Sequence, residues 1–163
     1  MAVAAAVAGC GGGGDSTTGA GGDTTSTAGG ESSEASGPAP TKAAFIKEAD
    51  AICQKADGEL TEEVVAYAKA HNIDTGKEPT EPQLEEIYKE VVLPNIGKQG
   101  EAIASLTPPE GDEEVVDSIV EALESGVEEG QANPSELVEG KNPVADASAK
   151  AKAYGFKACG SGG

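Results

Sequence analysis

Residues 41–72, TKAAFIKEADAICQKADGELTEEVVAYAKAHN, decide the fold of this chain because one apolar stripe runs through them at helical spacing. The stripe recurs at steps of three and four residues, at Phe45, Ala49, Ile52, Ala56, Leu60 and Val64. Such spacing is typical of an amphipathic α-helix whose inner face packs against other helices. Thr41 provides a hydroxyl that can cap the start, and Cys53 lies beside the stripe. The pattern predicts one long helix that ends near His71.

The same spacing returns twice further along the chain. After the capping-box sequence at 80–83, a second stripe comprises Leu84, Ile87, Tyr88, Val91, Val92, Ile96, Ile103 and Leu106. Because the stripe continues on both sides of Pro94, we expect a kink there and not two separate helices. A third helix is expected after the break at 107–110, with the inner positions Val115, Val116, Ile119, Val120, Leu123 and Val127.

The C-terminal part contains two further helix starts. The Asn-Pro pairs at 133–134 and 142–143 each place an asparagine cap before a proline in the first turn. The second pair predicts a terminal helix through Tyr154, ended by Gly155 in a left-handed cap. Sustained alternation with a period of two residues is missing throughout. We therefore predict an all-α fold, a four-helix, mainly antiparallel bundle over residues 41–160, followed by a tail at 161–163.

The N-terminal segment has a different character. The run Val7-Ala8-Gly9-Cys10 has the form of a bacterial lipoprotein cleavage box. Residues 1–9 contain no Lys or Arg, which predicts a truncated or mis-started lipoprotein signal. We expect Cys10 to be lipidated and residues 10–40, rich in Gly, Ser and Thr, to form a disordered, flexible tether. The alternative is an Ala- and Gly-rich leader that contains a cysteine by coincidence.

The remaining cysteines fit an exported protein. With Cys10 assigned to the lipid, Cys53 and Cys159 form an even pair, which normally means a disulfide outside the cytoplasm. The chain-entropy model gives such a long loop about 4–5 kcal/mol of stabilisation. We expect the bridge to pin the last segment against the first helix.

The charge of the chain excludes one class of partner. The formal net charge is −18, with 29 acidic residues against 11 basic ones, all of them lysine. Nucleic-acid binding needs a basic face that releases counterions, so nucleic acid is not an expected partner. An anionic membrane surface also repels such a domain. We therefore expect membrane contact only through a lipid on Cys10, with the acidic surface keeping the domain soluble.

Three groups of residues carry a family resemblance. They are Phe45-Ile46 with Ala49 to Cys53, Val92-Leu93-Pro94 with Gln99 and Leu106 to Pro109, and Tyr154 to Cys159. As a set they resemble a group of small exported helical proteins, abundant in actinobacteria and their relatives, over the span from about Lys42 to Gly160. The resemblance implies a disulfide between Cys53 and Cys159 and an extracytoplasmic helical domain. Because that family has no assigned activity, the resemblance implies no catalytic or binding residue.

The chain has few side chains of the kind that catalysis or metal binding needs. Its single histidine, His71, lies near the expected end of the first helix, where a surface or capping role is favoured. It has neither the context of a nucleophile nor Cys or His partners at zinc spacing. The acidic runs at 110–114 and 128–129 lack the spacing of a calcium loop. We predict no enzymatic activity and no cofactor or metal site, and whether the acidic faces bind calcium stays open.

These observations lead to two functional hypotheses. The first is a non-enzymatic lipoprotein, anchored to the outer face of the cell membrane, whose acidic helical domain contacts another envelope protein. The second is a carrier of a small ligand or metal ion, with an interhelical pocket around Tyr67 and Tyr88.

Overall fold

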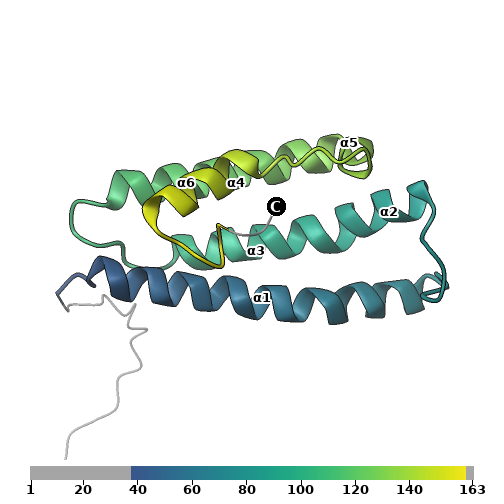
Figure 1. The fold of residues 1–163 in the computed structure, drawn as a ribbon, viewed down its shortest axis with the longest axis horizontal. Coiled ribbons are helices and arrows are strands. Elements are labelled where there is room, and N and C mark those ends of the chain that lie inside the picture. Colours follow the sequence, from purple (N-terminus) through teal and green to yellow (C-terminus); the bar gives the residue numbers. More distant parts are fainter. Residues whose placement is uncertain (1–37, 161–163) are drawn as a thin grey trace, which may run out of the picture. The chain divides into compact units, whose positions relative to one another are not determined.

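The computed structural model describes residues 38–160, and within this range it contains helices and no strand (Figure 1). The elements are α1 (Lys42–Ala70), α2 (Glu81–Ile87), the π-helical turn η1 (Tyr88–Val92), α3 (Leu93–Ala104), α4 (Glu113–Ala132), α5 (Pro134–Val138) and α6 (Ala145–Tyr154). Four main helices pack together, formed by α1, the run from α2 to α3, α4 and α6. The predicted all-α, four-helix fold is confirmed. The expectations for Cys10, for the tail and for all of the tether except residues 38–40 lie outside the described residues; residues 38–40 precede α1 and are not helical.

The first helix forms as its stripe predicts. The hydroxyl of Thr41 accepts a hydrogen bond from the backbone N–H of Ala44 at 3.3 Å, which caps the start of α1. The helix ends at its C-cap His71, and the next residue, Asn72, has a φ of 55°. This left-handed conformation, which asparagine tolerates, stops the helix near the predicted position.

The second helical run passes Pro94 without a break. Its start is capped by Gln83, whose side-chain oxygen accepts the N–H of Thr80 at 2.9 Å. Further along, the N–H of Leu93 bonds to the carbonyl of Tyr88, five residues earlier, in the π-helical turn η1. A proline ring clashes with the carbonyl four residues before it, so the wider turn just ahead of Pro94 relieves that clash. The predicted continuity is correct, and the irregularity expected at the proline is a π-helical turn.

Two details of the C-terminal half correct the sequence analysis. Val115 was expected inside, but its side chain is 47% exposed, because it lies beside the buried stripe that includes Val116 and Ile119. The terminal helix begins at Ala145 and not at the proline of the second Asn-Pro pair. The side-chain oxygen of Asn142 accepts the N–H of Val144 at 3.1 Å, so this asparagine forms a turn ahead of the helix.

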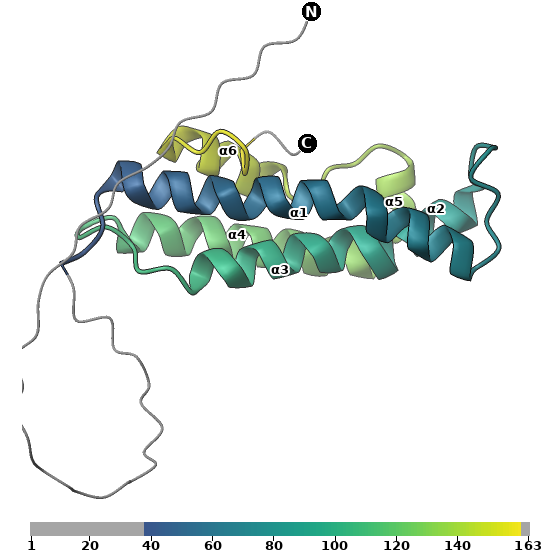
Figure 2. The ribbon, with the colours of Figure 1, turned by 90° about the horizontal axis from the view of Figure 1, so that it is seen from below.

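The main helices pack in alternating directions around two groups of buried side chains. Figures 1 and 2 show α6 near the beginning of α1, and α2 and α5 near its end. The larger buried group includes Phe45, Ala49, Cys53, Ile103, Val116, Ile119, Val120, Ala151, Tyr154 and Phe156. The smaller group consists of Ala68, Ile73 and Ile87, where the end of α1 meets α2.

The last helix is too short to complete the bundle along its whole length. It has 10 residues against 20 in α4, so it spans about 15 Å beside a partner of about 30 Å. The short helix α5 and the connection at 139–144 cover the rest of α4 (Figure 1). The bundle therefore has its fourth main helix only at the end that holds α6, and the other end is thinner because no main helix takes that place.

Candidate functional site

The disulfide joins the first helix to the segment that follows the last one. Cys53 and Cys159 are bonded, with their Cα atoms 5.3 Å apart and 106 positions apart in sequence. The predicted pairing is confirmed. Because disulfides persist in oxidising compartments, the bridge indicates that the domain works outside the cytoplasm.

A buried carboxylate that sequence analysis missed stabilises the same segment. Asp50 is only 7% exposed, and its Oδ1 accepts the backbone N–H groups of Lys157, Ala158 and Cys159 at 3.0, 2.8 and 3.4 Å. Three consecutive N–H groups thus converge on one charged acceptor, as in an anion-binding nest. The available signal was the position of Asp50 between the inward-facing Ala49 and Cys53, where an acid is unusual. Its oxygens serve the fold and are not available to a substrate.

A second polar group ties the beginning of α1 to α4 and α6. The hydroxyl of Tyr154 donates to Asp112 Oδ2 at 2.7 Å, and Lys42 Nζ lies 3.8 Å from the centre of the Tyr154 ring. Burial, together with the hydrogen bond to the Asp112 carboxylate, raises the pKa of Tyr154 above its ordinary value. A phenol that resists deprotonation in this way holds elements together and is a poor general base at neutral pH.

A third polar group links α1 to α3 in the interior. Asn95 is 4% exposed, and its Nδ2 donates to the carbonyl of Ala56 at 3.3 Å and to Glu63 Oε2 at 3.1 Å. Its Oδ1 accepts a hydrogen bond from Gln99 Nε2 at 2.9 Å. The buried amide is therefore satisfied on both sides, as an interior polar group must be. It fixes the register of the two helices.

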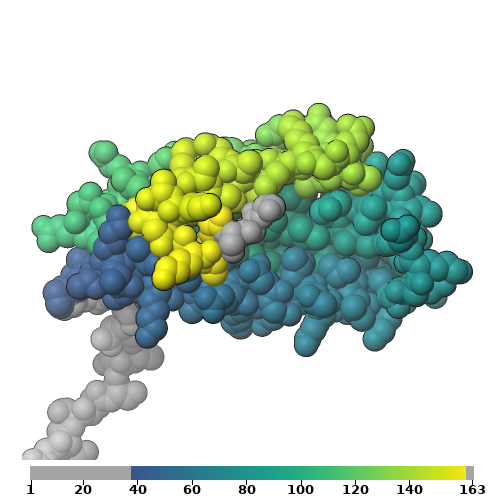
Figure 3. Space-filling model, in the orientation of Figure 1, coloured from purple at the N-terminus to yellow at the C-terminus, as the bar shows by residue number. Residues whose placement is uncertain are grey.

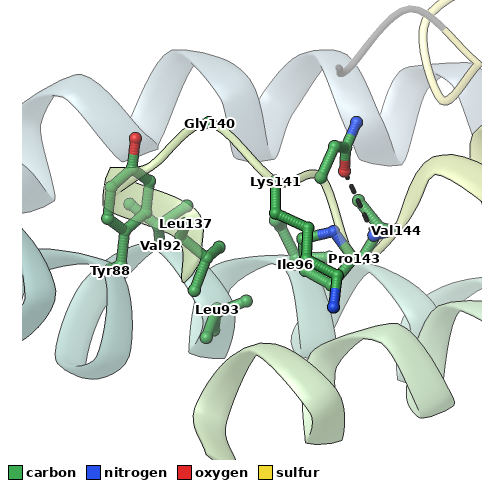
Figure 4. A pocket seen from close by; sticks show the side chains of 10 residues that line it. Tyr88, Val92, Leu93, Ile96, Leu137, Gly140, Lys141, Pro143 and Val144 are labelled. Carbon is green, nitrogen blue, oxygen red and sulfur yellow. Dashed lines mark hydrogen bonds between the residues drawn. The ribbon is translucent and has the colours of Figure 1, made fainter. Parts of the chain in front are cut away.

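A cavity of about 290 Å³ lies where the bundle is thin, between the run from η1 to α3 and the connection from α5 to α6. Figure 3 shows the surface hollowed between α1 and this connection. The lining residues are Tyr88, Val92, Leu93, Ile96, Leu137, Gly140, Lys141, Asn142, Pro143 and Val144. Figure 4 shows the Tyr88 ring with Leu137 at one end and Ile96 with Pro143 at the other. The walls are mainly apolar, as in many small-molecule sites.

The ammonium group of Lys141 is already paired with two carboxylates. It lies 2.8 Å from Glu129 Oε1 and 2.6 Å from Glu136 Oε2, and these hydrogen bonds raise the pKa of Lys141 above its usual range. The pairs connect the loop around Lys141 to α4 and α5. An anionic ligand in the cavity would have to compete with two carboxylates for this lysine.

The structure places only one of the two tyrosines that were expected to line an interhelical pocket at this cavity. Tyr88 lines the cavity, whereas Tyr67 packs against the smaller buried group and stacks on His71, with ring centres 4.0 Å apart. Tyr67 belongs to α1, and α1 contributes no residue to the cavity wall. Burial, with Glu86 and Glu90 nearby, raises the pKa of Tyr67.

The other candidates from the sequence are placed as follows. His71 is the exposed C-cap of α1, in agreement with the surface or capping role. Among residues 38–160, no group of three or more His, Cys, Asp or Glu side chains is arranged to hold a metal ion. Within the same range, none of the helices combines the length and hydropathy that crossing a bilayer requires.

Comparison of the chain with protein-family models, curated proteins and solved structures gives no match.

Proposed function

We propose that this protein is a non-enzymatic lipoprotein, anchored by a lipid on Cys10 and displaying its acidic helical domain outside the cytoplasmic membrane to another envelope component. The observation that carries the proposal is the Cys53–Cys159 disulfide, because it belongs to an oxidising compartment. The box at residues 7–10 supplies the anchor, and two acyl chains suffice for stable attachment. The resemblance to small exported helical proteins points to the same compartment.

The described surface suggests the chemistry of the partner. The outer face of α4 carries a row of exposed acids, consisting of Glu113, Glu114, Asp117, Glu121, Glu124 and Glu128. Clustered negative charge speeds association with a positively charged surface and discourages contact with anionic lipid or nucleic acid. A basic patch on another envelope protein is the partner that fits this face.

The anchor is tested by detergent phase partitioning of the protein from its host. The wild-type protein should enter the detergent phase, and Cys10→Ala should move it to the aqueous phase. The double variant Cys53→Ala/Cys159→Ala is the matched control, because it removes two cysteines and keeps the lipid site. Aqueous partitioning of the wild-type protein, or no change with Cys10→Ala, would contradict the proposal.

The partner is tested by crosslinking in intact cells. Reversing the charge of Asp117 and Glu121 on α4 should abolish a crosslinked species. Reversal of Glu48 and Glu62, two exposed acids on α1, is the matched control and should leave it in place. Equal loss in both variants would show that only net charge matters and would contradict a specific contact through α4.

A second function, binding of a small ligand, is favoured by the cavity beside Tyr88. It predicts that the protein extracted from host membranes retains a bound molecule, visible as an added mass in a native mass spectrum. A spectrum that contains only the lipidated chain would contradict the carrier function.

A further inference from the structure

The cavity beside Tyr88 is a built feature, because two glycines on α4 allow its wall to approach closely. A Cβ atom on Gly126 would lie 2.5 Å from the carbonyl oxygen of Pro143, which is closer than such atoms approach. A Cβ atom on Gly130 would lie 3.0 Å from Leu93 and 3.2 Å from Pro143. The connection that carries Pro143 is therefore pressed against α4 at both positions. The cavity is bounded there by packed backbone and not by a loose loop.

The opposite wall comes from the π-helical turn. Tyr88 and Val92, the first and last residues of η1, both line the cavity, and Leu93 and Ile96 continue the same wall. Turns whose hydrogen bonds join residues five apart are rare in proteins overall, but where they occur they often lie at functional sites. Residues four apart, such as Tyr88 and Val92, lie on the same face of a helical segment, one above the other. The turn thus places an aromatic and an aliphatic side chain together on the cavity side.

The polar groups of the lining select against charge in a ligand. The charged lining side chain, Lys141, is already paired with Glu129 and Glu136. The domain is strongly acidic overall, so an anion would be repelled on approach. The hydroxyl of Tyr88 has no hydrogen-bond partner among residues 38–160 and can serve one polar group of a ligand. None of the described residues that line the cavity is an acid, so a cation finds no counter-charge there, and the expected ligand is neutral and mostly hydrocarbon.

The volume limits the size of the ligand. A cavity of roughly 150 Å³ holds one benzene molecule, and this one measures about 290 Å³. It therefore suits a molecule about the size of two fused rings, or a short hydrocarbon chain.

We infer that the cavity beside Tyr88 is a binding site for a neutral, mainly hydrocarbon molecule of about two-ring size that carries one group able to hydrogen-bond to Tyr88. This inference rests on the second function proposed above and names its site and ligand class. The π-helical turn η1 forms the binding site, whereas the disulfide stabilises the opposite end of the bundle.

The test is a fluorescence titration of the full chain, with Cys10→Ser to avoid lipidation, using 2-naphthol, a two-ring molecule with one hydroxyl, as the neutral probe. The matched anionic probe is 6-hydroxynaphthalene-2-sulfonate, which has the same two rings and hydroxyl and an added sulfonate. Saturable binding at one site is expected for the neutral probe, with affinity about tenfold weaker for the anionic one, equivalent to about 1.4 kcal/mol. Equal or tighter binding of the anionic probe would overturn the ligand class.

Variants test the location. Ile96→Trp should fill the cavity and abolish binding, whereas Ile52→Trp, at another half-buried isoleucine that does not line the cavity, should leave it unchanged. Tyr88→Phe, which keeps the ring, should weaken binding of the neutral probe about twofold to tenfold through loss of one hydrogen bond. Circular dichroism on each variant shows whether it is folded, and Tyr88→Phe tests the site even where Ile96→Trp fails to fold.

Three further results would overturn the inference. They are no saturable binding, binding that Ile96→Trp leaves intact, and binding that begins only after residues 161–163 are deleted, which would mean that the chain fills its own cavity. The carrier function fails separately, when the native mass spectrum of host protein contains no ligand although the purified chain binds the probe.

Discussion

Replacing Asp50 by alanine is expected to destabilise the domain by about as much as breaking the disulfide does. The change leaves the N–H groups of Lys157 and Ala158, which now donate at 3.0 and 2.8 Å, without an acceptor, while the contact of 3.4 Å to Cys159 contributes little. Hydrogen bonds to charged groups contribute about 1.5–3 kcal/mol each, so two of them give about 3–6 kcal/mol. This is a large part of the 5–15 kcal/mol typical of a domain.

The measurement is urea unfolding of the unmodified chain, Asp50→Ala and Cys159→Ala. The chain-entropy model assigns the disulfide a similar value, about 4–5 kcal/mol, which reduction of the unmodified chain should reproduce. Since both interactions hold the same segment, the double variant should lose less than the sum of the two. Asp57→Ala, which removes an exposed acid of α1, is the control and should stay within about 0.5 kcal/mol.

The reasoning is refuted if Asp50→Ala loses less than about 1 kcal/mol, because the carboxylate then does not stabilise the terminal segment. Full additivity of the two changes would also contradict it, since the carboxylate and the disulfide would then act on independent parts of the molecule.

Two further predictions concern the ends of the bundle. Burial and Asp112 raise the pKa of Tyr154 in the folded protein. The stabilisation of the fold by the Tyr154 hydroxyl is therefore fully present below the ordinary phenol pKa of about 10 and is lost as pH rises above it. Urea midpoints measured against pH should fall above about pH 10, and less in Tyr154→Phe. Gly126→Ala should cost about 1–3 kcal/mol, because its Cβ would lie 2.5 Å from the Pro143 carbonyl. Thermal melting should show this loss, whereas Gly58→Ala, whose Cβ has nothing within 4 Å, should be neutral or stabilising; equal effects would contradict the packing argument.

The features that sequence analysis recovered depend on local pattern or on chemistry that pairs residues by type. The stripe of α1 and its Thr41 cap are written within a few residues of one another, so helix and cap could be predicted together. The disulfide followed from the two cysteines that are left once Cys10 is assigned to a lipid, not from geometry. The continuity of the helix through Pro94 followed from apolar residues on both sides.

The features that it missed depend on residues far apart in the chain. The position of Asp50 beside inward-facing residues is unusual for an acid, but its partners, the N–H groups of 157–159, lie more than 100 positions later and cannot be predicted from local pattern. The cavity exists because α6 is short and because Gly126 and Gly130 admit a distant loop. The expected pocket included Tyr67 because a stripe tells which residues face inward, but not which neighbours they meet.

The position of the Asp50 acceptors has a consequence for how the protein is made. A ribosome joins Lys157 to Cys159, which satisfy the carboxylate of Asp50, more than 100 residues after Asp50 itself. Until they arrive, the helix that carries Asp50 has an uncompensated charge at its packing face, which opposes stable association with its neighbours. A nascent chain therefore stays short of its final stability until residues 157–159 have been joined. If the domain is exported as an unfolded chain, that delay keeps it competent for transport, and any product that terminates before residue 157 remains a substrate for proteases.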